Sequence, residues 1–205
     1  HASWSLSTLT AGAPRPMNFT DSKGSNTFDR GANRSGADWA FLERLRGKWQ
    51  GKLIVKGVTS AADALRIRSL GADAIYVSNH GGRQLDSVPP AIRLLPLIRA
   101  AVGPEFPLLF DSGIRNGEDI IKALALGADF VMIGRPALFA LGAEGAAGLN
   151  ALLSCFATDI SVVMAQLGIT SIDQLGPNVI FQDASHAHVD AETKTQAALR
   201  LAAKT

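Results

Sequence analysis

Short runs of apolar residues alternate with amphipathic stretches through the middle of the chain. Each run ends in polar or glycine residues, and each is followed by a stretch whose apolar positions have helical spacing. Apolar strands that alternate with amphipathic helices indicate a parallel sheet covered on both faces. The predicted strands are 53–56, 74–78, 107–111 and 130–134, and the predicted helices are 38–49, 60–70, 89–102, 117–126, 143–167 and 171–175.

A short internal repeat supports this alternation. The tetrapeptide Leu-Gly-Ala-Asp occurs at 70–73 and again at 126–129, each time directly before a predicted strand. Each glycine is expected to end a helix in the left-handed conformation, so that a short turn leads into the strand. Repeated βα units of this size are typical of (β/α)8 barrels and of doubly wound sheets.

The patterning weakens toward both ends of the chain. Residues 1–36 are rich in Ser, Thr, Gly and Asn and are predicted to be a partly flexible loop region. Residues 37–175 carry the strong patterning, and residues 176–205 begin with Gly-Pro and are predicted to be a tail. No apolar run approaches the ~20 residues that a membrane span needs.

Composition narrows the classes of protein that need consideration. The 205 residues are 47% hydrophobic and 19% charged, which excludes wholesale disorder. A formal net charge of +2 gives no electrostatic case for a nucleic-acid partner. The single cysteine, Cys155, is expected to lie in the core of the last long helix. His186 and His188 form a His-x-His pair without further ligands, so no metal site is predicted.

Charged and titratable residues follow every predicted strand, and in a barrel the carboxyl ends of the strands face the active site. His80 and Arg83 follow the second strand and suit a substrate with a carboxylate next to an acidic proton. The arginine would bind the carboxylate in a fork and the histidine would take the proton. A purely structural histidine is the alternative.

Two strand-to-helix turns, at 113–115 and 134–135, combine a glycine with an arginine. Free backbone N–H groups at such helix starts favour an anion, and barrels often bind phosphate in their last two loops. We therefore expect a phosphate there, unless the glycines only permit tight turns and the arginines are solvated.

Lys56 and Asp111 end the first and third strands, and spacing alone leaves their roles open. Lys56 would either pair with an acid or stabilise negative charge on a ligand, and a Schiff-base lysine is a competing interpretation. Asp111 would either hold a hydroxyl or amide of a ligand or pair with Lys56.

The strand-end residues lie in the segments LIVKGVTSAADALRIRSLGADAIYVSNHGGRQLD and PLLFDSGIRNGEDIIKALALGADFVMIGRP. These segments closely resemble the C-terminal half of the FMN-dependent α-hydroxy-acid dehydrogenases and oxidases. That family includes flavin-type L-lactate dehydrogenases, (S)-mandelate dehydrogenases and glycolate oxidases. The motif SNHGGRQLD is highly specific to the family, and the resemblance runs from about Trp39 to Leu175.

The resemblance implies an α/β fold, a (β/α)8 TIM barrel of which this chain supplies the last four βα units. It implies FMN as cofactor and the oxidation of an (S)-2-hydroxy acid to the 2-oxo acid. His80 would be the base, Arg83 would bind the substrate carboxylate, and Lys56 would stabilise the reduced flavin. The cofactor-binding residues that the resemblance implies are Lys56, Ser78, Asp111, Ser112, Gly113, Ile114, Arg115, Gly134 and Arg135.

The resemblance also implies partners and a location. We expect the N-terminal half of the same barrel, on a separate or cleaved chain, and a homo-oligomer such as a tetramer. The expected location is the cytoplasm, with a peripheral position at the inner membrane as the alternative. Two other functions stay open: a non-redox phosphate-binding barrel enzyme, and an inactive half-barrel that serves as an assembly subunit. The sequence names neither the substrate side chain nor the electron acceptor, and it leaves hydride and carbanion mechanisms open.

Overall fold

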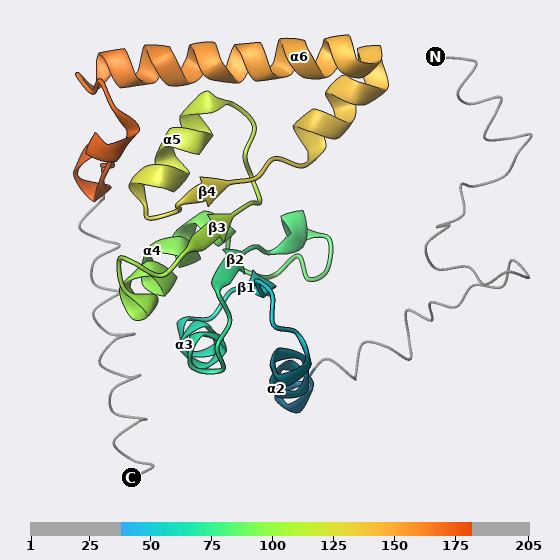
Figure 1. Cartoon of the computed structure of the whole chain (residues 1–205). Helices are drawn as coiled ribbons and strands as arrows, with labels where there is room; N and C mark the ends of the chain where they lie inside the picture. Colours follow the sequence, from blue (N-terminus) through green and yellow to red (C-terminus); the bar gives the residue numbers. More distant parts are fainter. Residues whose placement is uncertain (1–37, 182–205) are drawn as a thin grey trace, which may run out of the picture. The chain divides into compact units, whose positions relative to one another are not determined.

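The computed structural model describes residues 38–181 (Figure 1). The chain divides into two compact units after Gln50. The first described helix, α2 (Trp39–Lys48), belongs to the first unit, and Asp38 caps it by accepting the Phe41 N–H at 2.7 Å. The second unit contains the sheet. The predicted loop region 1–36, most of the predicted tail, and both tail histidines lie outside the described residues.

The second unit is a run of four βα units with all strands parallel, as predicted. The strands follow one another in the sheet in the order β1-β2-β3-β4. Three short 3₁₀ helices complete the described part of the chain. The elements are β1 (Ile54–Val58), α3 (Ala61–Ser69), β2 (Ala74–Val77), η2 (His80–Gly82), α4 (Ala91–Val102), β3 (Leu108–Phe110), α5 (Gly117–Ala125), β4 (Phe130–Val131), α6 (Arg135–Gln166), η3 (Ile172–Gln174) and η4 (Pro177–Val179).

The core lies between the sheet and the helices α3, α4 and α5. Ile75 and Val77 of β2, with Leu108 and Phe110 of β3, point to this face and are completely buried. The opposite face of the sheet is not covered to the same degree by the described residues, since Phe130 is 59% exposed and Ile54 47%. The prediction of a sheet covered on both faces is therefore correct for one face only in this part of the chain.

The repeated tetrapeptide builds the same contact twice. Asp73 accepts the N–H of Leu53 at 2.9 Å, and Asp129 accepts the N–H of Leu108 at 2.7 Å. In each case a carboxylate at the start of one strand holds the start of the preceding strand. The glycine before it has φ +85° or +106°, the left-handed conformation that the sequence predicts. The repeat therefore sets the register of two neighbouring strand pairs.

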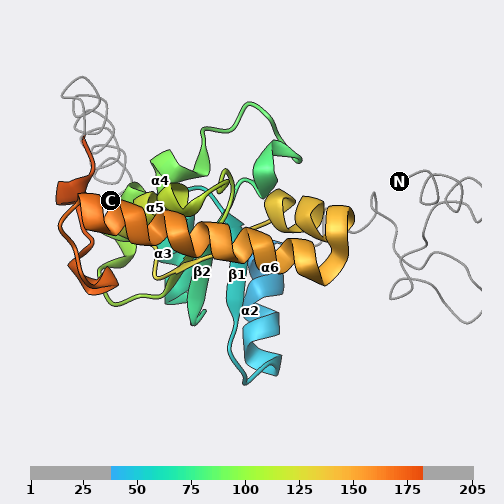
Figure 2. The same ribbon diagram turned by 90° about the horizontal axis from the view of Figure 1, so that it is seen from above.

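Helix α6 differs from its prediction in both start and shape. It begins at Arg135, directly after the short β4, rather than at residue 143. It bends at Glu144 and Gly145, whose backbone is not helical, and its longer second part runs along α5 (Figures 1 and 2). Cys155 lies on the exposed side of this part, so the prediction of a core cysteine is wrong. The reason is that Phe156, its neighbour, is the residue that α6 buries.

Among the described residues, α6 is the one helix that is long and apolar enough to cross a membrane, by length and composition only. Only 6% of its most apolar stretch is buried within the structure. The sequence shows no unbroken apolar run of that length, because polar residues such as Asn150, Ser154 and Asp159 interrupt it. One such helix is weak evidence for a membrane span, and the bend divides it.

The close packing of α5 on α6 depends on Gly117. A Cβ atom at this position would lie 2.5 Å from the Asp159 Cβ and 2.6 Å from the Phe156 carbonyl oxygen. We expect Gly117→Ala to lower the free energy of unfolding by about 1–3 kcal/mol, because backbone atoms of α6 must shift. Urea denaturation measures this change.

Gly142→Ala is the matched control for this substitution. Nothing lies within 4 Å of a Cβ atom at Gly142, which is also helical. This variant should gain roughly 0.5–1 kcal/mol from the better helix propensity of alanine. Equal effects of the two substitutions would contradict the packing argument.

Candidate functional site

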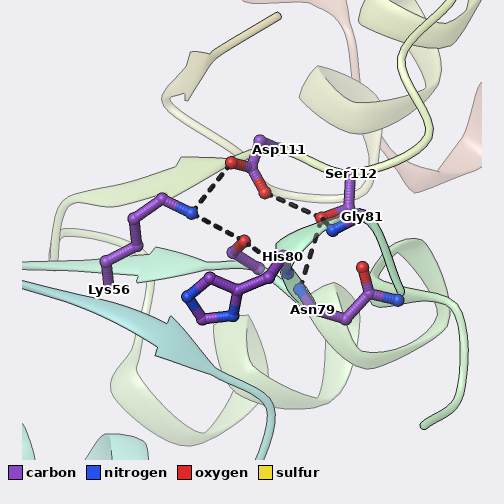
Figure 3. Close-up of polar contacts among 7 residues, drawn as sticks. Lys56, Asn79, His80, Gly81, Asp111 and Ser112 are labelled. Carbon is purple, nitrogen blue, oxygen red and sulfur yellow. Dashed lines mark hydrogen bonds and ion pairs between the residues drawn. The ribbon is translucent and has the colours of Figure 1, made fainter. Parts of the chain in front are cut away.

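The carboxyl ends of the first three strands bring three predicted site residues into direct contact (Figure 3). The Lys56 ammonium donates to the Ser78 hydroxyl at 2.8 Å and to an Asp111 carboxylate oxygen at 3.0 Å. The parallel pairing of β1 and β2 brings Lys56 close to Ser78, because Lys56 pairs with Tyr76, which lies two residues before Ser78. Asp111 thus pairs with Lys56, one of the two roles that the sequence left open.

Asp111 is the most strongly hydrogen-bonded carboxylate of this site. Burial alone would raise its pKa, but hydrogen bonds from Ser78, Ser112, Lys56 and Tyr76 outweigh burial and hold the pKa below its usual value. The carboxylate is therefore charged at neutral pH. Its negative charge keeps the Lys56 ammonium in place at the edge of the sheet.

Sequence reasoning missed Tyr76. Its ring lies under the Lys56 ammonium, with 4.3 Å between the nitrogen and the ring centroid. Burial raises the pKa of Tyr76 above its usual range, and a hydrogen bond to Asp111 and the charge of Asp111 raise it further. Tyr76 lies inside an apolar run, where an aromatic side chain usually indicates packing. Its contact with the Lys56 ammonium follows only from the pairing of the two strands.

Tyr76 is the one tyrosine of the chain, so its ionisation can be followed directly. A free tyrosine ionises near pH 10, whereas Tyr76 should stay neutral there in the folded protein. Because the folded-state pKa is raised, its contribution to stability is present below about pH 10 and is lost as the pH rises above it. Near-ultraviolet absorbance of tyrosinate during an alkaline titration tests this. Ionisation near pH 10 without unfolding would contradict the expected shift.

His80 lies on a tight turn after β2, in the short helix η2. Its φ is +56°, a conformation that side chains other than glycine rarely adopt. The imidazole packs against β1 at Gly57, where a Cβ atom would lie 2.7 Å from the ring. The pairing of β1 with β2 is irregular at this glycine. A glycine in β1 therefore makes room for the histidine ring.

Two predicted arginines differ in their contacts with this turn. The Arg135 guanidinium donates to the Gly81 carbonyl oxygen at 3.5 Å, so the start of α6 reaches the His80 turn. The Arg83 side chain is exposed and follows η2 directly. Its proposed contact with a substrate carboxylate is compatible with this exposure and stays a prediction.

The two predicted anion-binding turns differ in their backbone N–H groups. At the start of α5, Asn116 caps the helix, Asp119 accepts the Arg115 N–H at 2.8 Å, and Asp159 accepts the Gly117 N–H at 3.1 Å. Nearby side chains therefore already satisfy the N–H groups of Arg115 and Gly117, and the expectation of free N–H groups is wrong for these two. The start of α6 at Gly134 has no side-chain cap. An anion at the turn 134–135 is compatible with this uncapped helix start and stays a prediction.

The remaining predicted cofactor residues surround the same strand ends. Ile114 is buried, at 3% exposed, and its carbonyl oxygen accepts from the Arg115 side chain at 3.1 Å. Gly113 is exposed and has φ +93°. Ser112 has φ +82° and donates to Asp111 at 2.8 Å. Their contacts with a cofactor stay predictions.

Comparison with known proteins relates this arrangement to a family. A family model described as FMN-dependent dehydrogenase matches residues 1–182, which is most of the chain. The chain belongs to the FMN-dependent dehydrogenase family. This confirms the resemblance that its motifs indicate, and FMN is the cofactor of that family.

Individual members of the FMN-dependent dehydrogenase family support the same assignment. The chain is 46% identical to an L-lactate dehydrogenase of Pseudomonas syringae over 142 residues, which cover 69% of this chain and 37% of the relative. It is 40% identical to the (S)-mandelate dehydrogenase of Pseudomonas putida, over 88% of this chain and 47% of the relative. The crystal structure of a monotopic membrane protein, (S)-mandelate dehydrogenase, matches with a TM-score of 0.79 at 40% identity, over 89% of this chain and 50% of that one.

These matches confirm the predicted fold class, since the similar structures are FMN-dependent TIM-barrel enzymes. The chain spans about half the length of the curated relatives it matches. The four parallel βα units described above thus correspond to part of a barrel.

Proposed function

We propose that this protein takes part in the FMN-dependent oxidation of an (S)-2-hydroxy acid to the 2-oxo acid. The observation that carries the proposal is the Lys56 ammonium, fixed by Asp111 and Ser78 beside the His80 turn at the carboxyl ends of the strands. A cation, a histidine and an exposed arginine at one edge of a sheet suit an anionic substrate and a cofactor that gains negative charge.

The residues present fit FMN. An ammonium has three N–H donors, and the hydrogen bonds to Asp111 and Ser78 use two of them. The third is available to an acceptor on the flavin ring. The uncapped start of α6, with Arg135 at its first turn, suits the phosphate. Arg115 would add a second cation, whereas the first turn of α5 offers the phosphate no free N–H at Arg115 or Gly117.

The substrate-binding role falls to His80 and Arg83. Arg83 would hold the carboxylate in two parallel hydrogen bonds, which places the neighbouring carbinol carbon near the His80 imidazole. His80 would accept the proton that the 2-hydroxy acid loses. When bound, FMN supplies the acceptor for the two electrons. Lys56 would offset the negative charge that develops on the cofactor.

We further propose that other strands complete the barrel. Among the described residues, β1 and β4 each pair with one neighbour only, so each leaves an edge. The face that carries Lys56, Tyr76 and Phe130 is the less buried one. The occupant of this face would be the N-terminal half of the same barrel, on a separate or cleaved chain. The complete enzyme would be a homo-oligomer such as a tetramer.

The proposed location is the cytoplasm, with a peripheral position at the inner membrane as the second option. The relative with a TM-score of 0.79 is a monotopic membrane protein, and α6 is long and apolar. Centrifugation of the protein with lipid vesicles distinguishes the two locations.

Flavin binding and reduction test the proposed function. The purified protein, with whatever chain copurifies with it, is mixed with FMN, and binding is followed by flavin fluorescence. Anaerobic addition of lactate, glycolate or mandelate should then bleach the flavin absorbance. Binding of inorganic phosphate without binding of FMN would instead favour a non-redox phosphate-binding barrel. Bound FMN that no 2-hydroxy acid reduces would contradict the proposed activity.

A further inference from the structure

Ser112 has a backbone conformation that its residue type does not favour. Its φ is +82°, and among the described residues only His80 shares a positive φ without being glycine. Such a conformation is strained for a side chain that carries a Cβ atom, and it persists where surrounding contacts hold it. Glycine would adopt it without strain. The contacts of the hydroxyl group explain why a serine stands here.

The Ser112 hydroxyl joins the loop after β3 to the turn after β2 (Figure 3). It accepts the backbone N–H of Asn79 at 3.3 Å and that of Gly81 at 3.2 Å. It donates its own hydrogen to Asp111 at 2.8 Å. These three bonds connect the two residues that flank His80 to the carboxylate that pairs with Lys56.

These bonds leave the hydroxyl no further capacity. A serine hydroxyl has one donor hydrogen and two acceptor lone pairs, and all three are used here. The N–H of His80 itself is held in the same way by the Ser78 hydroxyl at 3.1 Å. Three successive N–H groups of the turn are thus fixed by two serines, both of which contact the Lys56–Asp111 pair.

We propose that Ser112 is a positioning residue that holds the His80 turn, residues 79–81, against Asp111, rather than a residue that contacts the cofactor. The strained backbone of Ser112 places its hydroxyl under the turn, and the turn places the His80 imidazole beside β1. The significance of this position for catalysis rests on the proposed function. The hydrogen bonds of Ser112 do not depend on the proposed function, so they can be tested without the cofactor.

Amide hydrogen exchange tests the proposal without any cofactor. Ser112→Ala removes the hydroxyl and keeps the Cβ atom, whereas Ser112→Gly removes both. In each variant the Asn79 and Gly81 amides should exchange about tenfold faster than in the unsubstituted protein, since each loses its acceptor. The Ile75 amide, bonded to the Pro107 carbonyl oxygen within the sheet, should keep its rate and so report an intact fold.

Ser69→Ala is the matched control. The Ser69 hydroxyl donates to the Arg66 carbonyl oxygen at 2.8 Å in α3, away from the site. Its loss should leave the Asn79 and Gly81 amides unchanged. Ser112→Gly should also unfold at a higher urea concentration than Ser112→Ala, because glycine relieves the strained φ. Unchanged exchange at both amides in both Ser112 variants would overturn the proposal.

FMN titration of the same proteins separates positioning from cofactor contact. Ser112→Ala with faster amide exchange and unchanged FMN affinity supports a positioning role. Lost FMN affinity with unchanged exchange overturns it in favour of direct contact with the cofactor. If the unsubstituted protein binds no FMN, the proposed function fails, and the exchange rates alone then decide the role of Ser112.

Discussion

Replacing His80 with alanine should slow flavin reduction by a 2-hydroxy acid by roughly 10²–10⁴-fold, the usual contribution of a general base. FMN affinity should change little, because the contacts expected to hold the cofactor come from Lys56 and from the start of α6. Anaerobic stopped-flow absorbance measures the reduction rate, and flavin fluorescence measures the affinity in the same preparation.

His80→Gly controls for the backbone at this position. Alanine keeps the strain of φ +56°, whereas glycine relieves it. If both variants lose the same factor in reduction rate, the effect comes from the missing imidazole and not from the backbone. Added imidazole should then restore part of the rate. An unchanged rate in His80→Ala, or a loss of rate that only reflects lost FMN, would rule out the assignment of His80 as base.

Removal of the Lys56 charge should change the pKa of Asp111 and slow the reduction of the flavin. In Lys56→Met, Asp111 keeps its burial but loses one of the hydrogen bonds that lower its pKa, so that pKa should rise toward the usual value. The negative charge that develops on the cofactor loses its counter-charge, and the reduction rate should fall roughly 10²–10³-fold. Stopped-flow absorbance measures the reduction rate, and FMN titrations show whether the variant still binds the cofactor.

Lys52→Met provides the matched comparison for Lys56→Met. Lys52 also pairs with an aspartate at 3.0 Å, but its side chain is 86% exposed and its partner is Asp73 at the start of β2. A surface pair of this kind contributes little. The variant should therefore keep its FMN affinity and its reduction rate. If the two lysine variants behave alike, the charge at Lys56 has no special role.

The sequence predicted helices and strands well where the spacing of apolar residues and the turn-forming residues indicated the same boundaries. The Leu-Gly-Ala-Asp repeats marked two helix ends and two strand starts, and the structure adds the backbone contacts of Asp73 and Asp129. The start of α6 was missed because Gly134 and Pro136 resemble a loop, although proline is well tolerated in the first turn of a helix. The bend at Glu144 depends on non-helical backbone that the apolar pattern does not encode.

The candidate site was predicted less completely than the fold. Residue types at the strand ends indicated Lys56, His80 and Asp111, and a parallel sheet brings its strand ends together. Two features of the site follow only from the three-dimensional structure. Tyr76 acquires its contact with Lys56 through register, and Asp119 and Asp159 occupy N–H groups that the sequence left free for an anion. Long-range pairing of this kind leaves no local pattern in the chain.

The order of the strands in the sheet has a consequence for how the chain connects them. Each strand pairs with the next strand along the chain, and the aspartate contacts that start these pairs join residues only 20 and 21 positions apart. Loop-closure entropy grows only slowly with loop length, so each of these two contacts closes a crossover of nearly the same entropic cost. The sheet is therefore built by repeating one connection between strands that are neighbours in the sequence, and none of its described strand pairs needs a connection across the whole chain.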